Sequence, residues 1–236
     1  MIEFPRAILW DLDGTLIDSA GDLAFALNRL LLEHGLEEVA EEMVRPMIGD
    51  GAARLVERGF AAAGKTLDAD LRPQVLRRFL FLYGQNPVRS TRPFDGAFEA
   101  MEALARKGCV HGICTNKPAA ITAAILERLR FSDRVKAVVG GDSTPYQKPH
   151  HAPLLRCLHQ LGRSGMPAMV VGDSENDVLA ARAANLPVVV VTFGYSRQPV
   201  QDLGADALAD RLDQLPGILA ELASPALIAH GAPTPG

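Results

Sequence analysis

Three aspartates stand within eight positions near the start of the chain, directly behind a short apolar run. Asp11 and Asp13 follow the run at residues 6–10, and Asp18 comes soon after them. A carboxylate in such a place can bind a hard cation, attack an electrophile or transfer a proton. Each of these reactions needs further polar groups, which other parts of the chain must bring to the same place.

Short apolar runs recur along the chain and alternate with segments of helical periodicity. The runs cover residues 6–10, 109–114, 135–139, 167–171 and 187–192, and the helical patterns cover about 96–107, 118–129, 151–162 and 175–184. Strands without polar alternation are typical of a sheet that is covered on both faces, and helices between strands indicate parallel crossovers. We therefore expect an α/β fold with a doubly wound, Rossmann-like parallel sheet.

This alternation is interrupted between the first run and the second. Consecutive helices are predicted there at 19–34, 38–45, 51–63 and 68–83, because their leucines recur at helical spacing. We expect a helical cap at 17–91, inserted into an α/β catalytic core made of 1–16 and 92–223. The last residues, 224–236, read as a C-terminal tail.

Polar residues follow several of the predicted strands. Asp11 ends the first strand, Thr115 and Asn116 end the second, Lys148 lies in the loop after the third, and Asp173 ends the fourth. The carboxyl ends of parallel strands meet at one edge of a sheet, where ligands bind. Carboxylates gathered there repel one another, and a hard divalent cation such as Mg²⁺ neutralises them most simply. A carboxylate beside such a cation and a lysine stays ionised and can attack a phosphoryl group.

Four motifs, in this order, resemble those of the haloacid dehalogenase superfamily of phosphatases. They are Asp11-Leu12-Asp13-Gly14-Thr15, Thr115-Asn116, Lys148-Pro149 and Gly172-Asp173-Ser174-Glu175-Asn176-Asp177. The resemblance covers about residues 1–195, and the stretches "DGTLIDSAGDLAFALN", "MIGDGAARLV" and "GDSENDVLAARAAN" are most similar to bacterial phosphoglycolate phosphatases. It implies Mg²⁺-dependent hydrolysis of a small phosphorylated metabolite, with 2-phosphoglycolate as the first choice.

The resemblance also implies roles for the acidic residues. Asp11 would be the nucleophile that forms an aspartyl-phosphate, and Asp13 would act as general acid and then as general base. The metal ligands would be Asp11, the backbone carbonyl of Asp13, and Asp173. Asp177 would support these ligands from outside the inner shell.

For the phosphoryl oxygens, the resemblance implies contacts from Thr115, the Asn116 backbone and Lys148. Local structural roles are the alternatives. Thr115 and Asn116 can shape the turn before a helix, and Lys148 alone would be an ordinary surface lysine. Both roles of the turn are compatible, because a helix N-terminus also attracts phosphate.

Two Ser-x-x-Asp sequences predict helix starts. Ser19 and Asp22 form one of them, and Ser174 and Asp177 form the other. We expect the first pair to have a structural role. In the second pair, the capping arrangement competes with direct metal binding by Asp177.

Substrate specificity is expected in the cap. Gly49, Asp50 and Gly51 lie between two predicted helices, where glycines let the backbone approach a ligand closely. The alternative is a simple turn. If the substrate is phosphoglycolate, its carboxylate needs a donor, for which Arg45, Arg54 and loop N–H groups are candidates.

Other functions share these motifs. A phosphatase of the same family can act on a sugar phosphate, a nucleotide or pyrophosphate. A phosphomutase would retain the phosphoenzyme, and a non-catalytic phospho-accepting protein would place aspartates at similar strand ends. The inserted helices and Asp13 disfavour the last of these.

The composition argues against two classes of binding partner, nucleic acids and membranes. The net charge of −4 comes without a long basic run, which argues against nucleic-acid binding. No segment approaches the ~18 apolar residues that a membrane helix needs. Cys109, Cys114 and Cys157 lack Cys-x-x-Cys spacing, so we expect free thiols and a cytoplasmic protein without membrane partners. The oligomeric state is left open.

Overall fold

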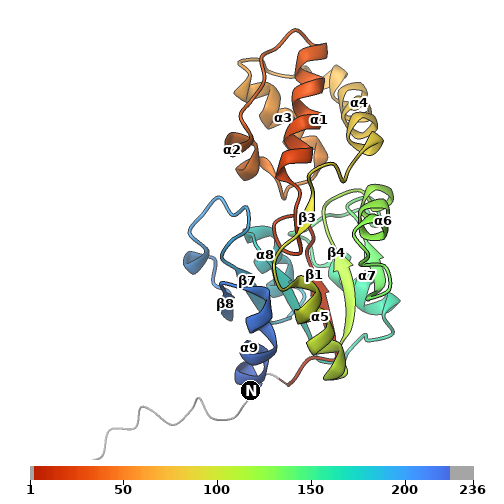
Figure 1. Cartoon of the computed structure of the whole chain (residues 1–236), viewed down its shortest axis with the longest axis vertical. Helices are drawn as coiled ribbons and strands as arrows, with labels where there is room; N and C mark the ends of the chain where they lie inside the picture. Colours follow the sequence, from red (N-terminus) through yellow and green to blue (C-terminus); the bar gives the residue numbers. More distant parts are fainter. Residues whose placement is uncertain (1–2, 224–236) are drawn as a thin grey trace, which may run out of the picture.

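A parallel sheet forms the lower part of the molecule in Figure 1. This computed structural model describes residues 3–223, so the tail predicted at 224–236 lies outside the described residues. The six strands of this sheet are, in spatial order, β5 (Val135–Val139), β4 (Val110–Cys114), β1 (Ala7–Trp10), β6 (Ala168–Gly172), β7 (Val188–Val191) and β8 (Ala207–Ala209). Each neighbouring pair is parallel. The predicted doubly wound α/β fold is confirmed, and its strand order reverses at β1.

Helices cover both faces of this sheet. Ile8 and Trp10 of β1 face one apolar cluster, whereas Ala7 and Leu9 face the other, which explains why β1 has no polar alternation. The first cluster receives α5 (Ala97–Arg106), α6 (Ala119–Arg128) and α9 (Leu215–Leu222). The second receives α7 (Ala152–Gln160) and α8 (Glu175–Ala183).

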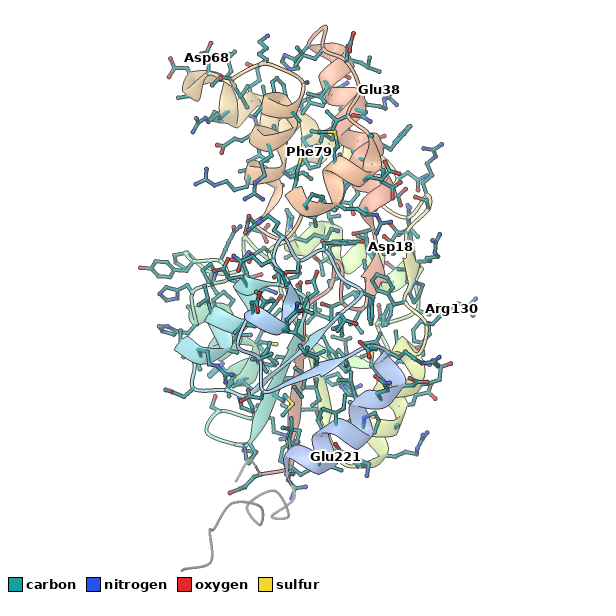
Figure 2. All side chains as sticks on the ribbon, turned by 90° about the vertical axis from the view of Figure 1, so that its left-hand side faces the viewer. Asp18, Glu38, Asp68, Phe79, Arg130 and Glu221 are labelled. Carbon is teal, nitrogen blue, oxygen red and sulfur yellow. The ribbon has the colours of Figure 1, made fainter. Side chains whose placement is uncertain are left out.

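A second group of helices lies above the sheet in Figure 1. It consists of α1 (Ala20–Glu33), α2 (Glu41–Val44), α3 (Ala52–Ala62) and α4 (Arg72–Gln85). Leu27, Phe60 and Phe79 are fully buried there, and Figure 2 shows Phe79 inside the bundle. The predicted helices are therefore present, with two differences. The one expected at 38–45 is α-helical only at Glu41–Val44 and continues as a 3₁₀ turn at Arg45–Met47, and the one expected at 68–83 begins with a 3₁₀ turn at Ala69–Leu71. None of the described helices is both long and apolar enough to cross a membrane.

The chain passes between the two groups twice, and the two passages lie side by side. β2 (Ile17–Asp18) and β3 (Arg92–Pro93) form an antiparallel pair that joins Ile17 to Pro93 and Asp18 to Arg92. Figure 2 shows Asp18 at this junction. Sequence analysis did not predict these strands, because two residues give no periodicity. The exact domain boundaries, 17–91 for the cap, stay a prediction.

The predicted capping role of Ser19 and Asp22 is wrong. Ser19 makes no side-chain hydrogen bond to the start of α1, and its Oγ lies 2.5 Å from Oδ1 of Asp13. The Asp22 carboxylate accepts N–H groups from Arg89, Ser90 and Thr91 at 2.8–3.0 Å. Asp22 thus has a structural role, but it ties α1 to the second passage rather than closing the helix end.

Candidate active site

Asp11 lies at the carboxyl end of β1, where the strand order reverses. The Nζ atom of Lys148 lies 2.8 Å from Oδ1 of Asp11 and 2.6 Å from Oδ1 of Asp177. Asp11, Asp173 and Asp177 each offer a carboxylate oxygen, and these oxygens lie within 4.8 Å of one another. The structure therefore brings together residues from three of the four sequence motifs around one buried lysine.

Asp173 is held by close packing and by a backbone donor. The N–H of Tyr195 donates to Oδ2 of Asp173 at 2.6 Å, and a Cβ on Gly194 would lie 2.2 Å from Cβ of Asp173. Gly14 has a φ of +85°, and a Cβ there would lie 2.3 Å from Oδ2 of Asp173. Only glycine fits at position 14, because a side chain would meet both the left-handed backbone and the carboxylate.

The negative charge of the three carboxylates exceeds the single positive charge of Lys148 beside them. Burial raises the pKa of Asp11 to about 6, although the neighbouring Lys148 opposes the rise. Burial also raises the pKa of Asp173 well above its usual value, and the negative charges of Asp11 and Asp177 add to the effect. A divalent cation would relieve this repulsion. Oxygen donors at this spacing fit a hard ion such as Mg²⁺, so Asp11 and Asp173 can hold a metal.

Of the two roles that the sequence left in competition, Asp177 has the capping role, and its direct binding to a metal stays a prediction. The N–H and Oγ of Ser174 donate to Oδ2 of Asp177 at 3.2 and 2.7 Å, so the predicted capping box is present. The other oxygen, Oδ1, faces Lys148. One carboxylate therefore starts α8 and joins the charged cluster.

Asn116 holds two loops next to the predicted phosphate site. Its Nδ2 donates to the carbonyls of Gly49 and Lys148, and its Oδ1 accepts the N–H of Lys148, all at 2.9 Å. Thr115 accepts the N–H of Lys117 at 3.2 Å. The Asn116 side chain is thus occupied, which agrees with a phosphate contact from its backbone alone.

The loop of Gly49, Asp50 and Gly51 lies against the sheet domain. Asp50 Oδ2 contacts Arg58 of α3 and lies 2.6 Å from Nη1 of Arg197, which follows β7. Burial would raise the pKa of Asp50, but hydrogen bonds from groups including these two guanidinium groups lower it to about 2. Asp50 is therefore a link between the two parts of the chain, while both glycines line the cavity beside Asp11.

The structure does not bring the two candidate arginines to that cavity. Arg45 lies 3.1 Å from Asp18 and 3.0 Å from Glu41. Arg54 is exposed and pairs with Glu57 at 2.8 Å. Both guanidinium groups pair with carboxylates outside the cavity. Their predicted contact with a substrate carboxylate stays a prediction that no contact in the structure supports.

Two residues of the site were missed by sequence analysis. Lys117 is buried, and its Nζ contacts Oδ1 of Asp13, to which the Ser19 hydroxyl also donates. Tyr83 of α4 is buried beside it, with 5.0 Å between Nζ of Lys117 and the centre of the Tyr83 ring. The position of Lys117 directly after Thr115-Asn116 was a usable signal. Tyr83 gave none, because it stands on the apolar face of its helix.

These residues surround a small cavity between α1, α3, α4 and the sheet edge. Its volume is about 40 Å³. A single buried water molecule needs roughly 10–15 Å³, so the cavity is small. It is lined by Asp11, Asp13, Leu23, Ile48, Gly49, Gly51, Ala52, Leu55, Phe79, Leu80, Tyr83, Thr115, Asn116, Lys117 and Pro118.

Comparison with known proteins supports the family resemblance of the motifs. A family model for haloacid dehalogenase-like hydrolases matches residues 8–191. A phosphoglycolate phosphatase of Rhodospirillum rubrum is 44% identical over 210 residues, which cover 87% of this chain and 87% of that protein. A phosphoglycolate phosphatase of Caulobacter vibrioides is 41% identical over 199 residues, with 84% of each chain covered.

A solved structure shows the same arrangement. The crystal structure of a predicted phosphoglycolate phosphatase from Haemophilus somnus matches with a TM-score of 0.83 and 32% sequence identity, covering 92% of this chain and 99% of that one. The family match at 8–191 spans all four motifs and the helices between the first two. The chain therefore belongs to the haloacid dehalogenase-like hydrolase family.

Proposed function

We propose that the chain is a Mg²⁺-dependent phosphomonoesterase that hydrolyses 2-phosphoglycolate to glycolate and phosphate. The observation that carries this proposal is the position of Asp11. It lies at the end of the central strand, beside Lys148 and two further carboxylates, and it lines the same cavity as Asp13. The chain is a phosphatase by family, and the finer assignment of substrate and mechanism is our own.

The reaction would proceed in two steps. Asp11 attacks phosphorus in line and forms an aspartyl-phosphate, while Asp13 protonates the departing alkoxide oxygen. Asp13 then takes a proton from the water that hydrolyses this intermediate. Ser19 and Lys117 both contact Oδ1 of Asp13, which fixes the orientation of its carboxyl group.

The phosphoryl oxygens would be held by Lys148, Thr115 and the Asn116 backbone. Burial alone would lower the pKa of Lys148, but the carboxylates of Asp11 and Asp177 outweigh it and raise the pKa, so the ammonium keeps its charge. Asp11, Asp173 and the Asp13 carbonyl would hold Mg²⁺, with Asp177 in support. When bound, the ion supplies further positive charge to the phosphoryl group.

Two observations favour a small substrate. The curated relatives of Rhodospirillum rubrum and Caulobacter vibrioides are named phosphoglycolate phosphatases. The cavity beside Asp11 is also small, at about 40 Å³, which favours a small phosphate ester over a nucleotide or a hexose phosphate.

The test is phosphate release from a panel of phosphomonoesters, with and without Mg²⁺, for the wild type and Asp11→Asn. We expect 2-phosphoglycolate to give the highest kcat/KM and the activity to depend on both Mg²⁺ and Asp11. Wild-type turnover by Asp11→Asn would show that the nucleophile is assigned wrongly. A better hydrolysis of sugar phosphates would reject the substrate but keep the reaction class.

A further inference from the structure

The cavity contains a positive charge that is not assigned to the phosphoryl group. Among the described residues that line it, Lys117 carries the only positive charge, and Lys148 is not part of the lining. Burial would lower the pKa of Lys117, but the Asp13 carboxylate outweighs it and raises the pKa, so the group is an ammonium at neutral pH. An ammonium has three N–H donors, and one contact with Asp13 leaves others free.

The hydroxyl group of Tyr83, next to the Lys117 ammonium, is a hydrogen-bond donor without an acceptor. The Tyr83 hydroxyl is buried, and its polar neighbour Lys117 can only donate, so within residues 3–223 the hydroxyl proton has no acceptor. Burial raises the pKa of Tyr83 to about 12, so the hydroxyl keeps its proton. A buried polar group without a partner is costly, and a bound ligand can supply the missing acceptor.

The rest of the cap side of the cavity is apolar. Ile48, Leu55, Phe79 and Leu80 line it and offer no side-chain hydrogen bonds. An anionic group of a substrate would be destabilised against such a wall unless a cation met it. Among the side chains that line the cavity outside the predicted phosphoryl site, Lys117 of the sheet domain and Tyr83 of the cap are therefore the donors that can meet a negative charge.

The position of Lys117 and Tyr83 relative to Asp13 determines which part of a bound substrate these two side chains can contact. Asp13, as the general acid, must approach the ester oxygen that leaves with the alcohol. Lys117 contacts the same carboxyl group, so it lies next to the leaving alcohol rather than on the phosphoryl side. In 2-phosphoglycolate the carboxylate carbon is two bonds from the ester oxygen, which puts the carboxylate in this neighbourhood.

We propose that Lys117 Nζ and the Tyr83 hydroxyl bind the carboxylate of the substrate and so determine its class: small phosphate esters whose ester carbon bears a carboxylate. The inference rests on the proposed phosphatase function. It assigns specificity to one residue of the sheet domain and one of the cap, in place of the cap arginines Arg45 and Arg54, whose guanidinium groups pair with other carboxylates.

The test compares 2-phosphoglycolate with ethyl phosphate, in which a methyl group replaces the carboxylate. Steady-state kcat and KM are measured for the wild type, Lys117→Met, Tyr83→Phe and the control Lys65→Met, which removes an exposed cap lysine. We expect the wild type to prefer 2-phosphoglycolate. Lys117→Met should reduce that preference about tenfold or more, mainly through KM, because hydrogen bonds to charged groups contribute this much. Tyr83→Phe should reduce it by about threefold, and Lys65→Met should leave it unchanged.

The ratio of the two substrates separates carboxylate binding from other roles. Loss of the contact between Lys117 and Asp13 slows both substrates alike and leaves the ratio intact. An unchanged ratio in the folded variants would overturn the inference, and Tyr83→Phe decides alone if circular dichroism shows that Lys117→Met is unfolded. Equal hydrolysis of both substrates by the wild type would also overturn it while the phosphatase stands. No phosphate from any ester of the panel would instead reject the proposed function.

Discussion

The backbone N–H of Tyr195 donates to Oδ2 of Asp173 at 2.6 Å, while the hydroxyl of the same tyrosine reaches the junction between sheet and cap. There it accepts the N–H groups of Ser19 and Ala20 at 2.9 and 3.2 Å and donates to Oδ1 of Asp18 at 2.7 Å. One buried residue therefore holds a candidate metal ligand through its backbone and the start of α1 through its side chain. These two tasks can be separated by mutation.

Tyr195→Phe removes the hydroxyl and leaves the backbone donor in place. The N–H of Ser19 loses its side-chain acceptor, and the N–H of Ala20 keeps only the longer contact of 3.4 Å with Asp18, so we expect the free energy of unfolding to fall by about 1–3 kcal/mol. The Mg²⁺ concentration that gives half-maximal phosphate release should stay close to that of the wild type. Urea unfolding and Mg²⁺ titration measure the two effects, and Tyr146→Phe, at an exposed tyrosine, is the control. A large change in Mg²⁺ dependence with no loss of stability would contradict this separation.

Gly14→Ala tests the packing around Asp173. The new Cβ would lie 2.3 Å from Oδ2 of Asp173, and φ is +85°, so we expect both a loss of stability and a displaced carboxylate with weaker Mg²⁺ dependence of activity. Gly64→Ala is a matched control, because Gly64 has a φ of +79° but no atom within 4 Å of the added carbon. Thermal unfolding and Mg²⁺ titration of both variants separate backbone strain from the clash. Equal Mg²⁺ dependence in the two variants would show that Gly14 has only a conformational role.

The sequence predicted the sheet well because β1 and its neighbours are short apolar runs covered on both faces. It failed after residue 192, where β8 is Ala-Leu-Ala and α9 has only eight residues with a proline near its start. Such short segments carry no clear period, and their structure depends on packing against β7 and α5.

The site was predictable where it follows strand ends and unpredictable where it depends on the cap. Asp11, Lys148 and Asp173 were found because the topology of a parallel sheet brings strand ends together. Tyr83 was not, because an aromatic residue on the buried face of α4 reads as core until the facing residue is known. Ser19 was misread for a similar reason: its hydroxyl turns to Asp13 across the junction, and a local capping pattern contains no information about that partner.

The link between Asp50 and Arg197 joins the cap loop to the sheet domain and gives a pH-dependent contribution to stability. Burial would raise the pKa of Asp50, but hydrogen bonds from Arg197, Asn176 and Arg58, with the charge of Arg58, lower it from 3.8 to about 2. A carboxyl group with a lowered pKa stabilises the folded state above its unfolded pKa, and the contribution is lost as the pH falls through the folded pKa. The group is partly exposed, so solvent screening reduces the contribution to about 1 kcal/mol.

Asp50→Asn should therefore lower the free energy of unfolding by about 1 kcal/mol at pH 7. The difference from the wild type should stay constant down to about pH 4 and shrink as the pH falls from there towards 2, because the wild-type carboxylate then becomes protonated as well. Urea unfolding at a series of pH values measures it, with Asp70→Asn, at an exposed aspartate of the cap, as the control. A difference that persists unchanged to the lowest pH at which the protein folds would mean that the charge of the Asp50 carboxylate does not stabilise the link between the cap loop and the sheet domain.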